Sequence, residues 1–515
     1  MKNNFYLTTT LPYVNAPLHM GHALEFVRAD AIVRYKKLTG YDVFFNTGTD
    51  EHGIKIYNKA KEEGLDPKDF VDRGFKVFKE QLKMFGVSED IHFIRTTDEH
   101  HIKAAQEFWK RVDKNGYIYK KNYEAKYCVG CESEKTDSEL DEKGECPLHP
   151  MRALDTIKEE NYFFKYSVFG EKLLDFYEKN PHFVVPDFRF NEIKNFVKNG
   201  LQDFSISRLK SKMPWGVAVP GDDTQVMYVW FDALTNYIST LGWPEEVESF
   251  TFPLNSDLTP TLPKGEGEET LPQPSPYKGE RESFFQKYWI NGTPTQYCGK
   301  DNTRFQAAMW QAMLFAAGLP NSYQIVVDGF ITGEGGVRMS KTIGNVVDPR
   351  DIVAEYGTDA LRYFLLREVS SFEDSPFTLE RFKDAYNSGL ANGLGNLVSR
   401  VMTMAENNIS EPYIPISKLV SKTYDEALEN FDIKKAMDVI WEFVTFADRT
   451  IQEEQPFKLV KVEKGEGVKI IQDLIEILNH ISDLLLPFLP ETAQKIKDCI
   501  LQNKKPEVPL FLRKD

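Results

Sequence analysis

Two histidines stand three residues apart near the start of the chain, in the order His19-Met20-Gly21-His22. The motif follows a short β-rich segment and opens a helical pattern, so both imidazoles are expected on the first turn of one helix. A helix N-terminus favours phosphate, and Gly21 lets a ligand approach the backbone closely. The two rings would add hydrogen-bond donors to a developing negative charge, which suits chemistry at a phosphoryl group. A pair of ordinary capping histidines is the alternative.

A second candidate is a short basic stretch at residues 338–342 (RMSKT), which follows a glycine-rich segment at residues 332–336 (TGEGG). Glycines permit a mobile loop, and Lys341 is a cation that such a loop could deliver to a triphosphate. Alone this pattern is weak evidence, because lysines in Gly/Ser loops are usually solvated. The value of this pattern as evidence depends on the other motifs in the chain.

A cysteine cluster has the spacing of a metal site, Cys128-x2-Cys131-x14-Cys146-x2-His149. Three thiolates and an imidazole supply a closed tetrahedral shell, which predicts one structural zinc ion and no open position for chemistry. The chain has 5 cysteines in 515 residues, too few for a disulfide scaffold. The spacing therefore indicates a zinc knuckle in a reducing compartment.

The composition bounds the class of protein. Hydrophobic residues make up 41% and charged residues 27% of the 515 residues, which is typical of a globular chain with three or four domains. No apolar run approaches the ~18–20 residues that a bilayer span needs, and the N-terminus lacks the features of a signal peptide. We therefore expect a cytoplasmic protein that does not bind membranes. With 63 basic and 78 acidic residues the net charge is −15, so any nucleic acid must bind through local basic patches.

The elements around the histidine motif form a βαβ pattern. Residues 5–10 and 41–46 read as strands, and residues 17–38 as the helix between them, with Gly40 as its stop. Its core stripe is expected to contain Leu24, Val27, Ala31 and Tyr35. A βαβ unit predicts a parallel sheet that binds ligands at the carboxyl ends of its strands.

The same pattern returns late in the chain. A strand, a helix and a further strand are expected at residues 295–298, 301–317 and 325–327. The helix is expected to face inward with Phe305, Met309, Ala312 and Ala316, and to stop at Gly318 and Pro320. The polar stretch between the two halves, which carries the cysteines, is interpreted as an insertion into a split nucleotide-binding fold.

Two further segments differ in character. Residues 254–283 are rich in Pro, Gly and Glu without hydrophobic periodicity, which predicts a disordered loop; an ordered lid is the less favoured alternative. From about Thr378 onward, long amphipathic patterns such as 379–404, 424–454 and 468–501 predict a helical bundle.

The histidine motif and the lysine loop, in this order and on either side of a split βαβ fold, resemble the signatures of class I aminoacyl-tRNA synthetases. Further segments are similar to the methionyl-tRNA synthetases within that class: 11–22 (LPYVNAPLHMGH), 48–53 (GTDEHG), 228–233 (YVWFDA), 299–301 (GKD) and 394–400 (LGNLVSR). The resemblance covers nearly the whole chain apart from the 254–283 segment. It implies an α/β fold, with a Rossmann-like parallel sheet split by a zinc-bearing connective insertion and followed by an all-α helical bundle.

The resemblance also implies roles for individual residues. ATP would be held by His19, Gly21, His22, Gly299, Asp301 and Lys341, of which His19, His22 and Lys341 would be catalytic. Methionine would be held by Leu11, Tyr13, Asp50, Trp230, Ala233, Tyr237 and Gln306, with Asp50 on the amino group. The anticodon would be read by Asn396, Arg400 and Phe457. Aromatic walls suit a thioether, because sulfur–aromatic contacts contribute about 0.3–1.5 kcal/mol each.

Some positions depart from the family pattern. Gln306 stands where a pocket histidine is common, and Leu234 stands where proline is common. In the lysine loop, Arg338 and Thr342 replace the usual Lys and Ser but keep the charge and the hydroxyl. Phe457 replaces a tryptophan that stacks on the anticodon, and phenylalanine can still stack.

The expected domains follow this pattern along the chain. They are the first half of the catalytic domain at 1–115, the connective insertion with its zinc knuckle at 116–211, the second catalytic half at 212–325, the lysine-loop region at 326–376 and the anticodon-binding helical domain at 377–515.

The implied activity is that of a methionine–tRNA ligase. It would use ATP with Mg²⁺ to form methionyl-adenylate and pyrophosphate, and would then charge the 3′-terminal adenosine of tRNA(Met). The chain stops soon after the predicted bundle, without the dimerisation domain of many relatives, so we expect a monomer. One alternative is a class I synthetase for Leu, Ile, Val or Cys, although those for Leu, Ile and Val usually carry a much larger editing insertion. Another is a non-catalytic tRNA-binding paralogue.

Overall fold

The structure, a computed structural model, describes residues 4–130, 133–135, 140–148, 153–244, 282–337, 347–416 and 421–514. Its centre is a six-stranded parallel sheet. In spatial order its strands are β3 (His92–Arg95), β2 (Asp42–Thr49), β1 (Asn4–Thr9), β12 (Thr293–Gly299), β13 (Gln324–Asp328) and β7 (Val184–Val185). Strands β1 and β12 lie side by side, so the two predicted βαβ halves join into one sheet. The predicted parallel fold is confirmed.

Helix α1 (Met20–Leu38) packs on the sheet and is buried on almost every face. Its expected core stripe is buried, but so are four charged residues, Glu25, Arg28, Asp30 and Lys36. The helix begins at Met20 rather than at residue 17, because His19 is its N-cap. It ends at Leu38, and Gly40 then turns the chain with a φ of 89°, a value that favours glycine.

The buried charges of α1 tie the sheet to the C-terminal half of the chain. The Arg28 guanidinium donates to Asp328 at 2.8 Å and to the backbone carbonyl of Ser370 at 2.7 Å. Two residues further on, Asp30 pairs with Arg362 at 2.9 Å. Near its end, Lys36 reaches Glu429 at 2.7 Å. The first helix therefore contacts both the sheet and the helical region.

The late helix differs from its prediction. Residues 301–317 form a 3₁₀ turn at Lys300–Asn302, a π-helical turn at Phe305–Met309 and α9 (Trp310–Ala317). The wider π turn shifts the inward face. Phe305 and Met309 are therefore only half-buried, which corrects the prediction, while Gln306 is 2% exposed. Ala312 and Ala316 are buried, as expected, and Gly318 ends the helix in the left-handed conformation.

The segment between the two halves forms its own antiparallel sheets. One contains β5 (Ser133–Lys135), β4 (Ile118–Cys128), β6 (Asp155–Phe164) and β8 (Phe204–Ser205); the other contains β10 (Ala218–Val219), β11 (Asp222–Met227) and β9 (Ser207–Leu209). Helices α5 (Gly170–Lys179) and α6 (Asp187–Lys198) flank β7, which pairs with β13. The expected insertion therefore also supplies an edge strand to the central sheet.

The remaining helices of the sheet half lie between or after these strands in the order along the chain. They are α2 (Ile54–Glu62), α3 (Pro67–Met84), α4 (Glu99–Lys114), α7 (Val229–Ala233), α8 (Asn236–Ser239) and a π-helical turn at Phe285–Ile290. A two-stranded sheet of β14 (Ile331–Thr332) and β15 (Ser375–Pro376) follows toward the helical part.

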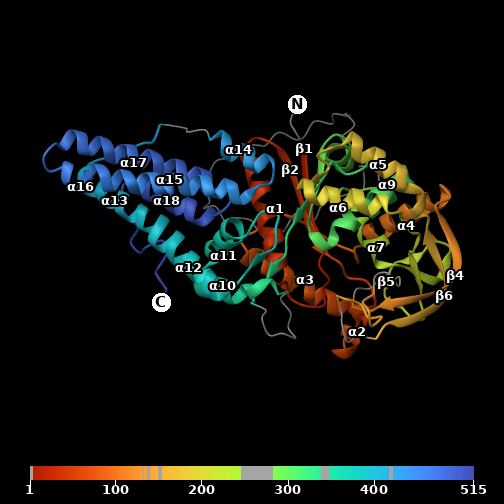
Figure 1. Cartoon of the computed structure of the whole chain (residues 1–515). Coiled ribbons are helices and arrows are strands. Elements are labelled where there is room, and N and C mark those ends of the chain that lie inside the picture. Colours follow the sequence, from red (N-terminus) through yellow and green to blue (C-terminus); the bar gives the residue numbers. More distant parts are fainter. Residues whose placement is uncertain are drawn as a thin grey trace, which may run out of the picture.

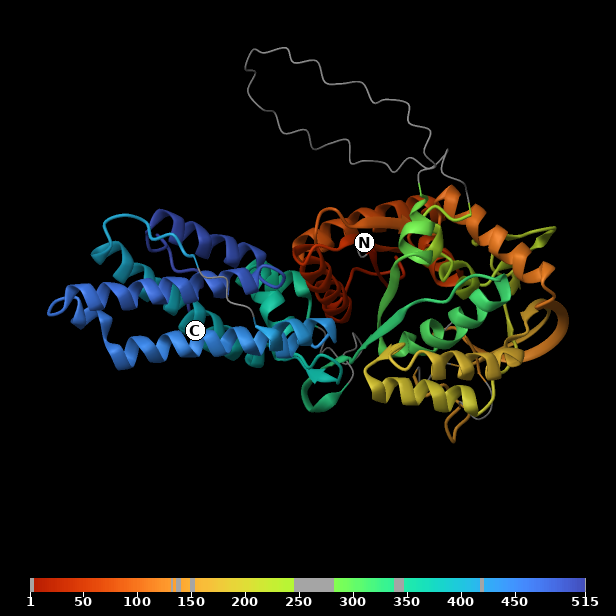
Figure 2. The same ribbon diagram turned by 90° about the horizontal axis from the view of Figure 1, so that it is seen from above.

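The C-terminal part is a helical bundle that extends away from the sheet half (Figures 1 and 2). Its helices are α10 (Pro349–Tyr356), α11 (Thr358–Tyr363), α12 (Leu379–Ala385), α13 (Asn396–Asn408), α14 (Lys422–Glu429), α15 (Ile433–Glu454), α16 (Pro456–Leu459), α17 (Lys464–Leu485) and α18 (Pro490–Gln502), with π-helical turns at Phe364–Glu368 and Tyr386–Gly395. Two of the long amphipathic patterns are broken. Phe431, with a φ of 59°, separates α14 from α15, and Pro490 opens α18.

Two further expectations from the sequence concern a disordered loop and membrane-spanning helices. Most of the predicted disordered loop, 254–283, lies outside the described residues. Among the described helices none is long and apolar enough to cross a membrane.

Candidate active site

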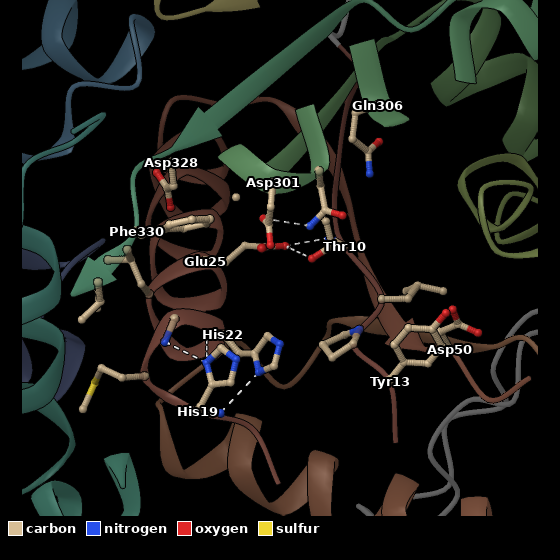
Figure 3. A pocket seen from close by; sticks show the side chains of 18 of the residues that line it. Thr10, Tyr13, His19, His22, Glu25, Asp50, Asp301, Gln306, Asp328 and Phe330 are labelled. Carbon is tan, nitrogen blue, oxygen red and sulfur yellow. Dashed lines mark hydrogen bonds between the residues drawn. The ribbon is translucent and has the colours of Figure 1, made fainter. Parts of the chain in front are cut away.

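A cavity of about 680 Å³ opens where β1, β2, β12 and β13 end (Figure 3). In parallel sheets ligands bind at this edge. Residues predicted from sequence gather around it, namely Leu11, Tyr13, His19, Gly21, His22, Asp50, Trp230, Ala233, Tyr237, Gly299, Asp301 and Gln306. The fold thus brings both the expected ATP-binding and the expected methionine-binding residues, apart from Lys341, to one place.

His19 and His22 cap helix α1 reciprocally. The backbone N–H groups of Gly21 and His22 donate to His19 Nδ1, at 3.1 and 3.4 Å, and the backbone N–H of His19 donates to His22 Nδ1 at 3.3 Å. The two rings stack with centroids 3.8 Å apart. A Cβ at Gly21 would lie 3.1 Å from the His19 ring, so a larger residue would disturb this arrangement.

This capping fixes which nitrogen of each ring carries a hydrogen. Because Nδ1 accepts from a backbone N–H in both rings, the neutral tautomer carries its hydrogen on Nε2. Desolvation and the neighbouring His19 lower the pKa of His22 well below its ordinary value. In this tautomer each ring carries an Nε2–H group, a kind of donor that can stabilise a phosphoryl group. The two residues are also the capping histidines of the alternative interpretation, and their role toward a phosphoryl group stays a prediction.

An aromatic and acidic group forms one end of the cavity. The Trp230 ring stacks on Phe305 with centroids 4.0 Å apart and planes 9° apart. Tyr13 and Asp50 lie together at this end in Figure 3, where Tyr13 bridges to Asp50 through the backbone. Asp50 is 3% exposed, and its backbone N–H donates to the Pro12 carbonyl at 3.1 Å. A buried carboxylate beside aromatic faces can bind an ammonium group.

A buried His–Asp–His group holds the two chain segments of this end together. His52 Nδ1 and His101 Nε2 each contact the Asp232 carboxylate, at 2.7 and 2.8 Å. Burial would raise the pKa of Asp232, but the two histidines outweigh it and hold the pKa at about 2. Asp232 lies two residues after Trp230, and His52 two residues after Asp50. The group therefore fixes the position of both cavity segments.

Carboxylates dominate the other end. Glu25 accepts from the backbone N–H and hydroxyl of Thr10, at 2.7 and 2.6 Å, and lies between Asp301 and the histidines in Figure 3. Burial raises the pKa of Glu25 to about 8, against the opposing hydrogen bonds from Thr10. Burial also raises the pKa of Asp328, although Arg28 pairs with it. Among the described residues that line the cavity there is no Lys or Arg.

Several expected site residues are not among the described residues that line the cavity. Lys341 and the rest of the 338–342 loop lie outside the described residues, although Gly336, which precedes them, lines the cavity. Asn396, Arg400 and Phe457 belong to the helical bundle.

The cysteine cluster is described only in part. Cys128 and Cys146 are 2% and 1% exposed, while Cys131 and His149 lie outside the described residues. Among the described residues no group of three or more His, Cys, Asp or Glu could hold a metal ion, so the zinc site stays a prediction. Leu148, from the same segment, lines the cavity.

Comparisons with known proteins agree with this geometry. The family described as class I tRNA synthetases (M) matches residues 5–155 and 151–402. A methionine–tRNA ligase of Caldanaerobacter subterraneus subsp. tengcongensis is 40% identical over 511 residues, covering 96% of this chain and 74% of that protein. A methionine–tRNA ligase of Brucella suis is 36% identical over 516 residues, covering 97% and 92%.

Solved structures give the same result. The Mycobacterium tuberculosis methionyl-tRNA synthetase in complex with methionyl-adenylate is 33% identical, with a TM-score of 0.82, covering 97% of this chain and 94% of that chain. This chain belongs to the methionine–tRNA ligase family. The family resemblance inferred from the motifs is therefore confirmed, and the interpretation as a Leu, Ile, Val or Cys synthetase is not supported.

Sequence reasoning missed some residues of the methionine–tRNA ligase cavity. Glu25 was overlooked, although it lies three residues after His22 and so shares its helix face. Phe305 was expected in the core rather than against Trp230. Gly329 was also missed: a Cβ there would lie 2.2 Å from the Glu373 backbone, so only glycine fits.

Proposed function

We propose that this chain activates L-methionine with ATP, forming methionyl-adenylate and pyrophosphate, and then transfers the methionyl group to the 3′-terminal adenosine of tRNA(Met). The observation that carries the proposal is the single cavity that unites the capping histidines with the aromatic and acidic end. The family membership supports it, as does the similar structure with methionyl-adenylate.

The aromatic end would bind the amino acid. Asp50 would hold the ammonium group, and Tyr13, Trp230 and Tyr237 would surround the thioether together with Leu11 and Ala233. An unbranched, polarisable side chain fits between aromatic faces better than a β-branched one. One methylene discriminates by only ~1–3 kcal/mol, so homocysteine should be a near-cognate substrate.

The histidine end would bind the nucleotide. The methionine carboxylate attacks the α-phosphorus, and pyrophosphate leaves in line. The Nε2–H donors of His19 and His22 would stabilise the charge that develops on the phosphoryl oxygens. Asp301 and Gly299 would hold the ribose, and Mg²⁺ bound with ATP would neutralise phosphate charge. No covalent enzyme intermediate is needed, because positioning and charge stabilisation suffice.

Lys341 would supply the missing cation. Gly336 lines the cavity, and five residues of extended chain span up to about 17 Å, so the chain after Gly336 is long enough to bring Lys341 to a bound triphosphate. We expect Lys341→Ala to slow adenylate formation by about 100-fold or more while methionine affinity changes little. Pre-steady-state adenylate formation measures the first quantity and equilibrium dialysis of methionine the second. Wild-type adenylation rates in this variant would remove Lys341 from the mechanism.

A zinc ion would be held by Cys128, Cys131, Cys146 and His149. The two described cysteines are buried sulfur donors, which fits a closed structural site. The Lys55 ammonium donates to the Gly130 carbonyl at 2.9 Å, so this segment contacts the cavity side of the molecule. We expect one zinc per chain by elemental analysis, and a loss of zinc in Cys146→Ser.

The helical bundle would bind the anticodon. Asn396 is exposed on α13, and Arg400, one turn on, is 34% exposed and pairs with Asp448 at 2.8 Å. Phe457 is 44% exposed on α16. Amide and guanidinium groups suit base edges, and an exposed ring suits stacking. Arg400→Ala should weaken charging of tRNA(Met) and leave pyrophosphate exchange unchanged.

The deciding experiment is amino-acid-dependent ATP–pyrophosphate exchange with methionine, homocysteine and a panel of other amino acids. Exchange with methionine above all others supports the proposal. Absence of exchange with every amino acid, together with retained tRNA binding, would support a non-catalytic paralogue instead. The cytoplasmic location and the monomeric state stay predictions; a sedimentation mass of about 119 kDa, twice 59.4 kDa, would contradict the monomer.

A further inference from the structure

Apolar side chains border the opening of the main cavity. Leu148 lines the cavity and is 61% exposed, so it lies at the mouth rather than in the interior. Ala16 and Pro17 line the same cavity and are also exposed. Deeper in the cavity the side chains are different, because Glu25 and Asp328 are buried carboxylates (Figure 3). The cavity therefore combines acidic groups in its interior with apolar groups at its mouth.

Leu148 is the largest of these three side chains, and it comes from a different part of the chain. Ala16 and Pro17 belong to the loop that leads into α1, whereas Leu148 belongs to the connective insertion. A single exposed leucine on an ordinary surface needs no explanation. Here the exposed leucine coincides with the mouth of the cavity, where a bound ligand can cover its apolar surface.

A hydrogen-bonded turn precedes Leu148. Asp141 Oδ1 accepts from the backbone N–H groups of Lys143 and Glu145, both at 2.9 Å, and the backbone N–H of Asp141 donates to the Glu145 carbonyl at 2.9 Å. The next residue, Cys146, is 1% exposed. Leu148 follows this turn and this buried side chain by two residues, so the local structure limits where its side chain can lie.

The insertion also contacts the wall of the cavity. The Lys55 ammonium donates to the Gly130 carbonyl of the insertion at 2.9 Å and lies 5.4 Å from the centroid of the Tyr13 ring. Tyr13 lines the cavity. The insertion that carries Leu148 is therefore attached to the cavity at a residue proposed to bind methionine.

The intermediate proposed for this cavity reacts with water. Methionyl-adenylate is a mixed anhydride of a carboxylic acid and a phosphate. Attack of a water oxygen on its carbonyl carbon breaks the carbon–oxygen bond to the phosphate, and the bonding electron pair leaves with the phosphate oxygen. The products are methionine, AMP and two protons, so ATP is consumed without charging of tRNA. Apolar surface that covers a reactive intermediate keeps water away from it.

We propose that Leu148 is a water-excluding residue that covers bound methionyl-adenylate at the mouth of the cavity. Its side chain becomes buried against the intermediate and shields the carbonyl carbon from solvent. Leu148 acts after the adenylate has formed, so it affects the lifetime of the intermediate and not the rate of its formation. The inference rests on the proposed function, because it names a residue that protects the intermediate of that reaction.

The test measures AMP formation from ATP and methionine in the absence of tRNA, with pyrophosphatase present. Each hydrolysed adenylate yields one AMP, so the steady-state rate after the first turnover is the rate of hydrolysis. We expect Leu148→Ser to raise this rate about three- to tenfold, as the loss of part of the burial of one leucine should. Rapid-quench adenylate formation and methionine affinity by equilibrium dialysis should stay at their wild-type values.

Further variants separate the side chain from its surroundings. Leu148→Met keeps the apolar volume and should keep the wild-type rate of hydrolysis, and Leu148→Ala should give an intermediate rate. Leu379→Ser is the matched control, because Leu379 is 57% exposed at the start of α12 and is not among the described residues that line the cavity. It should keep the wild-type rate. Elemental analysis should find the same zinc content in all variants, as expected if the predicted knuckle is intact.

The outcomes are distinguishable. An unchanged rate of hydrolysis in Leu148→Ser, with wild-type adenylate formation, would overturn the inference and leave the proposed function intact. The inference would also be wrong if chromatography recovered the extra product as free methionyl-adenylate, or if the rate rose only together with a loss of zinc. Absence of both pyrophosphate exchange and AMP formation in the wild-type protein would instead overturn the proposed function, and this inference with it.

Discussion

The two ends of the cavity differ in the charge of the side chains that they contain. At the methionine end, a buried line of amides and hydroxyls leads to Tyr237, and none of its members changes charge near neutral pH. At the nucleotide end, Glu25 and Asp328 are buried carboxylates with raised pKa values, beside an imidazole with a lowered one. Both ends lie at the same edge of the central sheet, where β1, β2, β12 and β13 end.

The difference follows from what each end is proposed to bind. A thioether side chain is uncharged, so fixed neutral donors and packing can recognise it at any physiological pH. A triphosphate carries several charges, so its end needs groups whose own charge is controlled. Protonation of Glu25 reduces the net negative charge that ATP would meet. The nucleotide end should therefore respond to pH and the methionine end should not.

The largest effect is expected at the histidine pair. His19→Asn keeps a good N-cap for α1 but removes the Nε2–H donor, so it separates the cap from the chemistry. We expect the rate of adenylate formation to fall about 100- to 1,000-fold with methionine affinity nearly unchanged. Rapid-quench measurements give the rate of adenylate formation. Thermal melting shows whether the cap still stabilises the protein. The exposed His182 offers the control His182→Ala. A wild-type rate in His19→Asn would show that the ring acts only as a cap.

A change of stability with pH is the next largest effect. The pKa of Glu25 is about 8 in the folded chain, against 4.5 ordinarily, so the folded state holds a proton that the unfolded chain releases. The free energy of unfolding should therefore fall as pH rises from about 4.5 to 8. Glu25→Gln removes this slope and should be more stable than wild type at pH 8, by up to several kcal/mol, and similar at pH 4.5.

Urea denaturation at both pH values measures this difference. Glu453, exposed on α15, provides the control Glu453→Gln, which should follow the wild-type profile. Parallel profiles for wild type and Glu25→Gln would contradict the raised pKa.

The smallest effect concerns Gln306. A neutral imidazole at this position can accept from Gln296 and donate to Tyr237, but a protonated one cannot accept. We therefore expect Gln306→His to bind methionine normally at pH 8 and up to about tenfold more weakly near pH 5.5. The wild-type KM for methionine should stay constant across this range. Equal pH dependence in both proteins would remove the contrast between the two ends.

The sequence predicts much of this site because its signals are local. The His19-x2-His22 spacing places two rings on one helix turn, and βαβ patterns predict a parallel sheet whose strands end at one edge. Each of these predictions needs only the spacing within one short segment. The aromatic residues of the 228–233 motif were assigned to the pocket through the resemblance to a known family instead.

The rest depends on contacts between distant segments. Gln296, Gln311 and Ser322 carry no motif, and only the packing of β12 against the following helix and loop joins them. The π-helical turn at 305–309 moved Phe305 out of the core, which a regular 3.6-residue period cannot anticipate. The pairing of Asp232 with His52 and His101 likewise joins residues far apart in the chain.

Helix α1 connects the cavity directly to the C-terminal half of the chain. The histidines that would touch ATP cap its first turn, while Arg28, Asp30 and Lys36 attach it to residues of the C-terminal half. An α-helix is stiff along its axis, so the capping rings and these attachments behave as points on one rod. A displacement of α11 or α14 would then reach the capping rings through α1 itself.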